Sequence, residues 1–188
     1  MPTLKLTYIL LSGFLSIGCD NGQSEAPLKN LTDSTTHLID STNINILFIG
    51  NSLTYSNDLP SLVKKEAASN GITISTKMIA YGNYAIIDHW HDGKVQEEIG
   101  TKKYDFVVIQ QGPSSQAYGR EVLLEYGAKF KSLCEENQTQ LAFFMVWPSR
   151  TYYHTFNGVI KNYTDAATLT NSILCPVGSV WKELDLQQ

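Results

Sequence analysis

The apolar positions along the chain fall into two alternating patterns. Short runs of β-branched, aromatic and leucine residues predict strands at residues 44–49, 73–79, 106–110 and 141–146. Between and after them, apolar residues recur every three or four positions and predict helices at residues 59–69, 86–99, 121–136 and 159–173. Such alternation predicts a parallel sheet. The run FVVI, apolar on both faces, is typical of a central strand that helices cover on each side.

The N-terminal residues have a different composition. Lys5 precedes the apolar run LTYILLSGFLSI, and Gly18 comes directly before Cys19. Residues 1–18 predict a secretion signal, because the apolar run is shorter than the roughly 20 residues of a membrane-spanning helix. The sequence SIGC resembles the bacterial lipobox, so Cys19 is the predicted lipidation site; signal cleavage without a lipid is the alternative. We therefore expect an exported protein of the bacterial cell envelope, either lipid-anchored or else periplasmic or secreted.

Composition separates a tether from one folded domain. Residues 19–43 are rich in Ser, Thr, Asn and Asp and predict a flexible tether, with the domain at residues 44–188. The chain has 14 basic and 18 acidic residues and a formal charge of −4. It shows no basic patch, which argues against a nucleic-acid partner, and membrane contact is expected only through the lipid anchor. Cys134 and Cys175 are predicted to be buried free thiols rather than a disulfide.

Small and amide-bearing residues collect where the predicted strands end. These exits are Gly-Asn-Ser at residues 50–52, Tyr-Gly-Asn at 81–83, Gln-Gln-Gly-Pro-Ser-Ser at 110–115 and Trp-Pro-Ser-Arg at 147–150. In parallel sheets, ligands bind beyond these strand ends. Ser52 on a tight turn is a candidate nucleophile, and the N–H groups of Ser52 and Gly82 are candidate donors to an oxyanion. The alternative for Ser52 is a turn that caps the next helix.

These exits also carry a family resemblance. Gly50-Asn51-Ser52-Leu53 follows a hydrophobic strand, has Gly82 downstream, and resembles the first block of the SGNH or GDSL hydrolase family. The segments VVIQQGPSSQ, FMVWPSR and CPVGSVW resemble a branch of that family from bacterial envelopes. The resemblance extends from Ile44 to about Trp181. It implies a three-layer α/β/α, flavodoxin-like fold with a parallel sheet, serine-based ester hydrolysis, and no metal or cofactor.

The resemblance assigns roles to particular residues. It implies Ser52 as the nucleophile, with oxyanion donors from the N–H groups of Ser52 and Gly82. The position of the family's oxyanion asparagine corresponds to Ser114, whose hydroxyl is shorter than an amide. Gln111, with Gln110 as the alternative, is therefore expected to supply the third donor.

Four residues at the same exits are expected to contact the substrate: Asn51, Ser114, Trp147 and His154. Trp147 and the aromatic residues at 152, 153 and 156 can stack on a sugar ring, with packing of their own loop as the alternative. Loop packing is also the favoured interpretation of His154. His89 and His91 are two residues apart on a predicted helix and point in different directions, so a solvated helix face is expected rather than a metal site.

The last family block, Asp-x-x-His, supplies a general base and does not occur after Val180. General-base assistance is worth roughly a hundredfold to ten-thousandfold in rate. The domain is therefore expected to be C-terminally incomplete. The expected function is ester hydrolysis, as a carboxylesterase or carbohydrate deacetylase acting on a small-molecule or carbohydrate ester, with inactivity of this chain left open because the Asp/His block is absent. The alternative is a non-catalytic envelope protein that binds acylated carbohydrate.

Overall fold

A five-stranded parallel sheet forms the centre of the domain. The computed structural model describes residues 43–185. The sheet has the order β2-β1-β3-β4-β5, and every neighbouring pair is parallel. Its strands are β1 (Ile44–Gly50), β2 (Ile74–Ala80), β3 (Phe106–Ile109), β4 (Gln140–Phe144) and β5 (Ile173–Cys175). The predicted α/β fold with a parallel sheet is confirmed.

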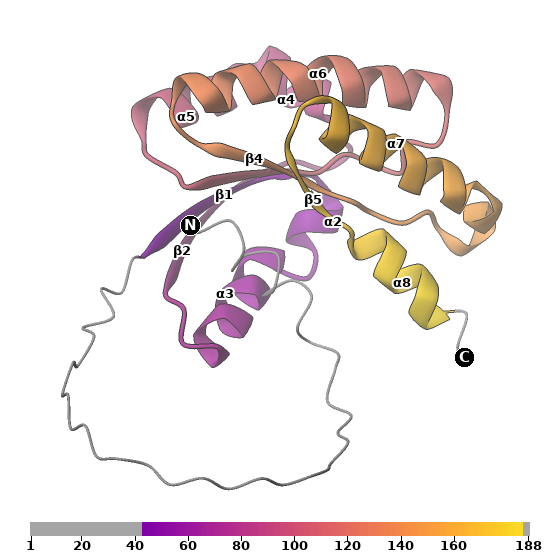
Figure 1. Ribbon diagram of the computed structural model, residues 1–188, viewed down its shortest axis with the longest axis horizontal. Helices are drawn as coiled ribbons and strands as arrows, with labels where there is room; N and C mark the ends of the chain where they lie inside the picture. The colour runs from indigo at the N-terminus through magenta and orange to yellow at the C-terminus, as the bar shows by residue number, and fades with distance from the viewer. Residues whose placement is uncertain (1–42, 186–188) are drawn as a thin grey trace, which may run out of the picture. The chain divides into compact units, whose positions relative to one another are not determined.

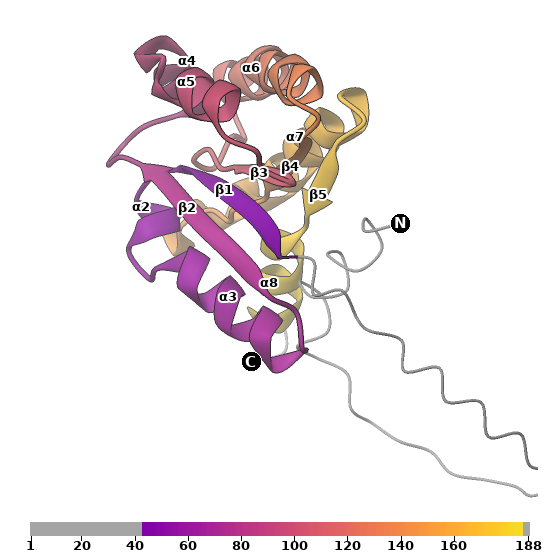
Figure 2. The same cartoon turned by 90° about the vertical axis from the view of Figure 1, so that its left-hand side faces the viewer.

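Helices cover both faces of this sheet. They are α2 (Ser52–Tyr55), α3 (Leu59–Ser69), α4 (Ile86–Asp92), α5 (Lys94–Thr101), α6 (Ala117–Glu136), α7 (Phe156–Leu169) and α8 (Val177–Asp185), with a 3₁₀ segment at Arg150–Thr155. Figures 1 and 2 show α4, α5, α6 and α7 on one face and α3 and α8 on the other. The result is the three-layer arrangement that the sequence predicts.

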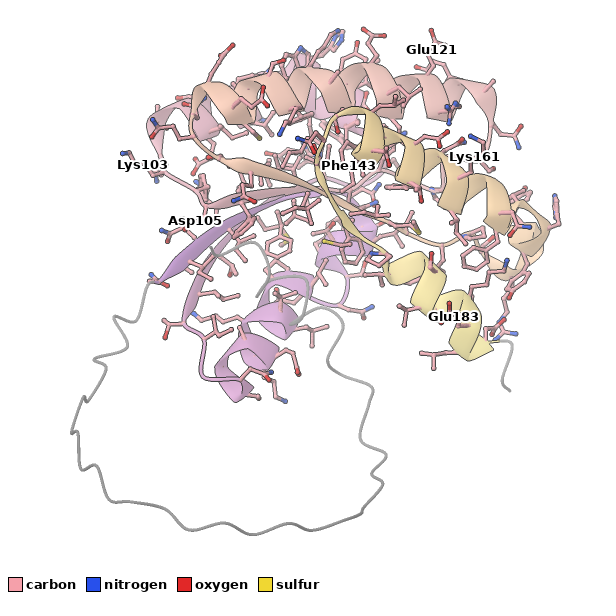
Figure 3. All side chains as sticks on the ribbon, in the orientation of Figure 1. Lys103, Asp105, Glu121, Phe143, Lys161 and Glu183 are labelled. Atoms are coloured by element: carbon pink, nitrogen blue, oxygen red, sulfur yellow. The ribbon has the colours of Figure 1, made fainter. Side chains whose placement is uncertain are left out.

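The core lies between the sheet and the layer of α4 to α7. All four residues of β3 are buried, because helices flank this strand on both faces. Figure 3 shows Phe143 of β4 between the sheet and α6, where it is fully buried. A Cβ on Gly127 of α6 would lie 2.7 Å from the Phe143 ring, so the lack of a side chain on this helix allows its close approach to the sheet.

Three predicted helices differ in their bounds. The helix expected at residues 86–99 is interrupted at Gly93, whose φ of 76° lies in the left-handed region, so α4 ends and α5 begins there. The helix at 121–136 begins earlier, at Ala117. The helix expected at 159–173 runs from Phe156 to Leu169, and residue 173 begins β5 instead. β5 was not predicted, since its three residues are too few for a periodic signal.

Several other expectations concern the ends of the chain and the thiols. The secretion signal, Cys19 and the tether up to residue 42 lie outside the described residues. Within residues 43–185, no helix is both long and apolar enough to cross a membrane. Cys134 and Cys175 are buried and free, as predicted. Burial raises the pKa of each thiol to about 12, so both stay protonated at neutral pH.

Candidate active site

A cavity of about 510 Å³ opens at the carboxyl ends of the central strands. It is lined by the loops that follow β1, β2 and β3 and by the first two turns of α6. β1 and β3 are neighbours, but the chain leaves them toward opposite faces of the sheet, which is where ligands bind in open α/β sheets. Ser52, Asn51, Gln111 and Ser114, which the sequence assigns to one site, all line this cavity.

One side of the cavity, the β1–β2 wall, consists of residues 51–53 and 82–85. Of these residues, Gly82, a predicted oxyanion donor, is exposed and does not line the cavity. Asn51 joins its two loops: its Oδ1 accepts from the N–H of Leu53 (3.1 Å), and its Nδ2 donates to the carbonyl of Tyr84 (2.9 Å). The Ser52 hydroxyl has no hydrogen-bond partner within residues 43–185. Nor do the N–H groups of Ser52 and Gly82 donate to any group in that range. This wall therefore carries one hydroxyl and two backbone donors that the described part of the chain leaves without partners.

Gly50 brings this wall into close contact with β3. A Cβ at this position would lie 2.2 Å from Thr54 Oγ1 and 2.6 Å from Gln110 Oε1. Both distances are far inside van der Waals contact, so only glycine fits. The Gly50 carbonyl accepts from the Tyr81 N–H (3.2 Å) and from His89 Nε2 (2.8 Å). The glycine of the Gly-Asn-Ser motif thus allows close packing below the site.

The opposite side is the β3 wall, residues 110–114, of which all but Gln110 line the cavity. Its two glutamine side chains have hydrogen-bond partners among the described residues. Gln110 is buried. Its Oε1 accepts from the Asn51 N–H (3.0 Å) and from Thr54 Oγ1 (2.9 Å), and its Nε2 donates to the Gln111 carbonyl (2.7 Å). Gln110 therefore acts as a link between the two walls.

Gln111 lines the cavity, but its amide is fully engaged. Nε2 donates to Ser114 Oγ (2.7 Å) and to the Gly119 carbonyl (3.1 Å), while Oε1 accepts from the Ile86 N–H (3.4 Å). The Ser114 hydroxyl in turn donates to the Gly112 carbonyl (2.9 Å). Both amide hydrogens of Gln111 are thus used within the protein, and the expected third oxyanion donor is not available from it in this arrangement.

Two residues of helix α7 support the β3 wall through hydrogen bonds. The Tyr163 hydroxyl accepts from the Gln111 N–H (3.2 Å) and donates to the Gln111 carbonyl (2.5 Å), and Asn162 Nδ2 donates to the Ser114 carbonyl (2.6 Å). Burial raises the pKa of Tyr163 above its usual range, so the phenol stays protonated and keeps its donor. No sequence pattern indicates this contact, because Tyr163 lies 52 residues after Gln111 along the chain.

None of the three histidines in the described part of the chain lines the cavity. The prediction of a solvated His89 is wrong: this side chain is 0% exposed, packs against Tyr81 and Tyr84, and bonds to the Gly50 carbonyl. Burial lowers the pKa of His89, and its Nδ1 is buried without a partner. His91 is exposed on the same helix, where its Nε2 contacts the Tyr126 hydroxyl (2.9 Å).

Trp147 and His154, both expected to contact substrate, do not line this cavity. Trp147 stacks on Trp181 of α8, with ring centroids 5.8 Å apart and planes within 8°, and Phe156 stacks on the same ring (5.9 Å). These contacts agree with the loop-packing interpretation. His154 is exposed beside Tyr152. Between Asn43 and Asp185, no group of three or more His, Cys, Asp or Glu side chains is placed to hold a metal ion.

The sequence also missed residues that line the cavity. Asn83 and Tyr118 belong to this set, with Tyr118 69% exposed at the rim, and Asp88 contributes the single charged side chain among the lining residues. The one available signal was an asparagine directly after Gly82, a residue type that tolerates the left-handed region. Asn83 has a φ of 64°.

Solved structures of hydrolases and esterases share this α/β fold. A protein of Slackia heliotrinireducens described as an SGNH hydrolase superimposes with a TM-score of 0.65 and 18% identity over 75% of this chain and 83% of its own. The psychrotrophic esterase EstA of Pseudoalteromonas sp. gives a TM-score of 0.56 and 11% identity, over 70% and 76%. At these identities the likeness establishes the fold.

A further similar structure is Axe2, an acetyl-xylooligosaccharide esterase of Geobacillus Stearmophilus. Its TM-score is 0.50 at 17% identity, over 71% of this chain and 77% of its own. No protein-family model and no curated protein sequence matches the chain. The predicted resemblance to SGNH hydrolases is therefore confirmed through the fold.

Proposed function

We propose that this domain hydrolyses esters with Ser52 as the nucleophile. The observation that carries the assignment is the β1–β2 wall, where the Ser52 hydroxyl lines a cavity and two N–H groups are left without partners in residues 43–185. Ser52 is half-buried, and backbone donors in such positions normally find partners in the protein or in water, whereas Gly82 is exposed. Unused donors beside a hydroxyl suit a carbonyl oxygen that becomes negative.

The chemistry follows from these groups. Ser52 Oγ attacks the ester carbonyl carbon, its proton passes through water to the oxygen of the departing alcohol, and the carbonyl oxygen becomes an oxyanion that accepts from the N–H groups of Ser52 and Gly82. The C–O bond to the alcohol then breaks, and the alcohol leaves with a proton. Water attacks the acyl-serine in the same way, which releases the acid and restores Ser52.

The cavity supports a small ester as substrate. Its volume of about 510 Å³ lies within the range of small-molecule sites. Tyr118 stands exposed at the rim and offers a ring face on which a sugar can stack. The similarity to an acetyl-xylooligosaccharide esterase points in the same direction, and we propose acylated carbohydrate as the preferred substrate class.

The absence of an imidazole from the cavity lining, within residues 43–185, favours a second candidate function. A serine without a general base reacts more slowly than one with a base, by roughly a hundredfold to ten-thousandfold. The second candidate is therefore a protein that binds acylated carbohydrate without turnover. It shares the cavity with the first and differs only in whether Ser52 reacts.

A fluorophosphonate probe separates the two. EstA has been captured with monoethylphosphonate as its inhibitor, so a phosphonate is a suitable reagent for this fold. We expect one phosphonate adduct on the wild-type protein by intact mass, none on Ser52→Ala, and an unchanged adduct on Ser132→Ala, whose hydroxyl lies exposed on α6. Equal labelling of Ser52→Ala would exclude the assignment. No labelling, together with measurable affinity for acetylated xylo-oligosaccharides, would support the binding protein.

We further propose export and anchoring through Cys19, which rests on the sequence alone. Mass spectrometry of the mature N-terminus from a bacterial host should find a lipid-modified cysteine at residue 19. A free amino terminus at another residue would contradict the anchor.

A further inference from the structure

We infer that Asn83 supplies the side-chain amide that stabilises the oxyanion, in place of Gln111. This inference rests on the proposed function of Ser52 and assigns a catalytic residue to it. Three side-chain amides line the cavity, and they differ in how much of their hydrogen-bonding capacity the protein uses.

Two of these amides are committed to holding the structure. Asn51 uses its oxygen and one N–H to join the two loops of the β1–β2 wall. Gln111 uses its oxygen and both N–H groups. Its rotation toward a substrate would leave the Ser114 hydroxyl and the Gly119 carbonyl without this donor. A buried acceptor that loses its partner costs about 1 to 3 kcal/mol, so such a rotation is unfavourable.

Asn83 is the amide that stays available. It is exposed, it lines the cavity, and its side chain forms no hydrogen bond within residues 43–185. Its left-handed backbone, with φ at 64°, places it in a turn that the Tyr84 N–H closes onto the Tyr81 carbonyl (3.3 Å). Gly82, with its unused N–H, precedes it in the same turn. This turn therefore carries a backbone donor and an amide donor side by side.

The turn is fixed next to the nucleophile. The hydrogen bond from Asn51 Nδ2 to the Tyr84 carbonyl joins the residue before Ser52 to the residue after Asn83. Ser52 is the sequence neighbour of one partner in this 2.9 Å hydrogen bond, and Asn83 is the sequence neighbour of the other. Both residues line the same cavity. We infer that the Asn83 amide acts together with the Ser52 N–H on a ligand in this cavity, with the Gly82 N–H in the same turn as Asn83.

The left-handed backbone allows a clean test by substitution. Asn83→Gly removes the amide and keeps the backbone without strain, because glycine adopts positive φ freely. Asn83→Asp keeps the shape and replaces the donor with a negative charge. The matched control is Asn171→Gly, since Asn171 has a φ of 47° after α7 and does not line the cavity.

The measurement is the Ser52-dependent hydrolysis of p-nitrophenyl acetate, obtained by subtracting the rate of Ser52→Ala. Removal of one oxyanion donor lowers kcat by about a hundredfold to a thousandfold in other enzymes. We expect a loss of about a hundredfold in kcat for Asn83→Gly with KM nearly unchanged, a larger loss for Asn83→Asp, and the wild-type rate for Asn171→Gly. The rate of phosphonate adduct formation on Ser52 should fall in the same order.

The outcomes separate the two levels of inference. If Ser52→Ala abolishes hydrolysis while Asn83→Gly keeps kcat within about twofold, Asn83 is not a donor and the function of Ser52 stands. A hundredfold loss in Gln111→Ala alone would return the role to Gln111. If wild type and Ser52→Ala react equally with ester and phosphonate, both the nucleophile and the role of Asn83 are excluded. Unfolding by urea confirms that each variant is folded before it is compared.

Discussion

The two walls of the cavity use their polar groups in opposite ways. In the β3 wall, the side-chain amides of Gln110 and Gln111 are engaged in hydrogen bonds with other residues, and the Tyr163 hydroxyl of α7 contacts the N–H and the carbonyl of Gln111. In the β1–β2 wall, Ser52 and Gly82 leave N–H groups without partners in the described residues. Polar groups of one wall thus stabilise the fold through hydrogen bonds, whereas donors of the other wall remain available to a ligand. Composition alone does not distinguish the two.

The junction of the walls at Gly50 should be the most sensitive point. Gly50→Ala places a methyl group 2.2 Å from Thr54 Oγ1 and 2.6 Å from Gln110 Oε1, which forces the walls apart. Overpacking of this severity costs about 3 kcal/mol in the free energy of unfolding. Urea unfolding followed by circular dichroism measures the loss.

Gly100→Ala is the matched control for this change. Gly100 lies inside α5, where an added Cβ meets nothing within 4 Å. Alanine is the better helix former, so a gain of about 0.5 to 1 kcal/mol is expected. Equal effects of the two substitutions would show that the walls are not in contact at Gly50.

The β3 wall should depend on one hydroxyl. Tyr163→Phe removes the group that contacts both the N–H and the carbonyl of Gln111. The carbonyl keeps the Gln110 amide as a donor, but the N–H is left buried without a partner, at a cost of about 2 kcal/mol. Tyr152→Phe is the control, because Tyr152 is 61% exposed. Equal stabilities of the two variants in urea would mean that α7 does not support this wall.

Below the β1–β2 wall, His89 should make stability depend on pH. Nε2–H donates to the Gly50 carbonyl, so protonation must occur at the buried Nδ1, and burial lowers the pKa of the folded state below 6.5. Asp88 and Asp92 oppose this shift and Lys94 adds to it. The unfolded chain then binds the proton more readily. The stabilising contribution is complete above pH 6.5 and declines as the pH falls below it, by at most about 1.4 kcal/mol per pH unit for one proton.

Urea unfolding between pH 7.5 and 5.5 measures this dependence. His91→Gln, on the exposed side of the same helix, should keep the wild-type slope. His89→Gln, whose amide can still donate to the Gly50 carbonyl, should flatten it. A slope that survives in His89→Gln would assign the dependence to other groups.

The contrast between the walls also explains what the sequence could predict. The strand pattern is clear because β1 and β3 are apolar on both faces, and α3 was predicted with its observed bounds. Gly93 does not by itself predict a break, because a single glycine inside a periodic pattern is often tolerated. Ile173 continues the helical spacing of apolar residues, so the pattern extends the predicted helix into β5.

The site was predictable only as a set of positions. Strand exits identify Ser52, Gln111 and Ser114 as neighbours, because parallel strands end at one edge of a sheet. Which amide is free depends on partners that no sequence pattern indicates: the Gln111 amide donates to the Gly119 carbonyl of α6 and accepts from the Ile86 N–H of α4. His89 shows the same limit. A polar residue on a predicted helix is expected to face solvent, but His89 is buried and its Nε2 bonds to the Gly50 carbonyl at the end of β1.

The smallest effect on stability should come from removal of the Thr54 hydroxyl, which links α2 to the β3 wall. Thr54 is buried, and its Oγ1 donates to Gln110 Oε1 (2.9 Å). Thr54→Val keeps the shape and removes the donor, but Gln110 Oε1 retains the Asn51 N–H (3.0 Å) and is not left without a partner. Because no buried group is orphaned, the expected cost in urea is only about 0.5 to 1 kcal/mol, well below that of Tyr163→Phe.

Thr54→Ser provides the complementary control, because it keeps the hydroxyl and removes the methyl group. A loss of about 1 kcal/mol is expected from the buried methyl alone. If Thr54→Val instead costs as much as Tyr163→Phe, the Asn51 N–H does not suffice to hold Gln110. The two walls would then be coupled through Thr54, and the free donors beside Ser52 would owe their positions to the same network that fixes the β3 wall.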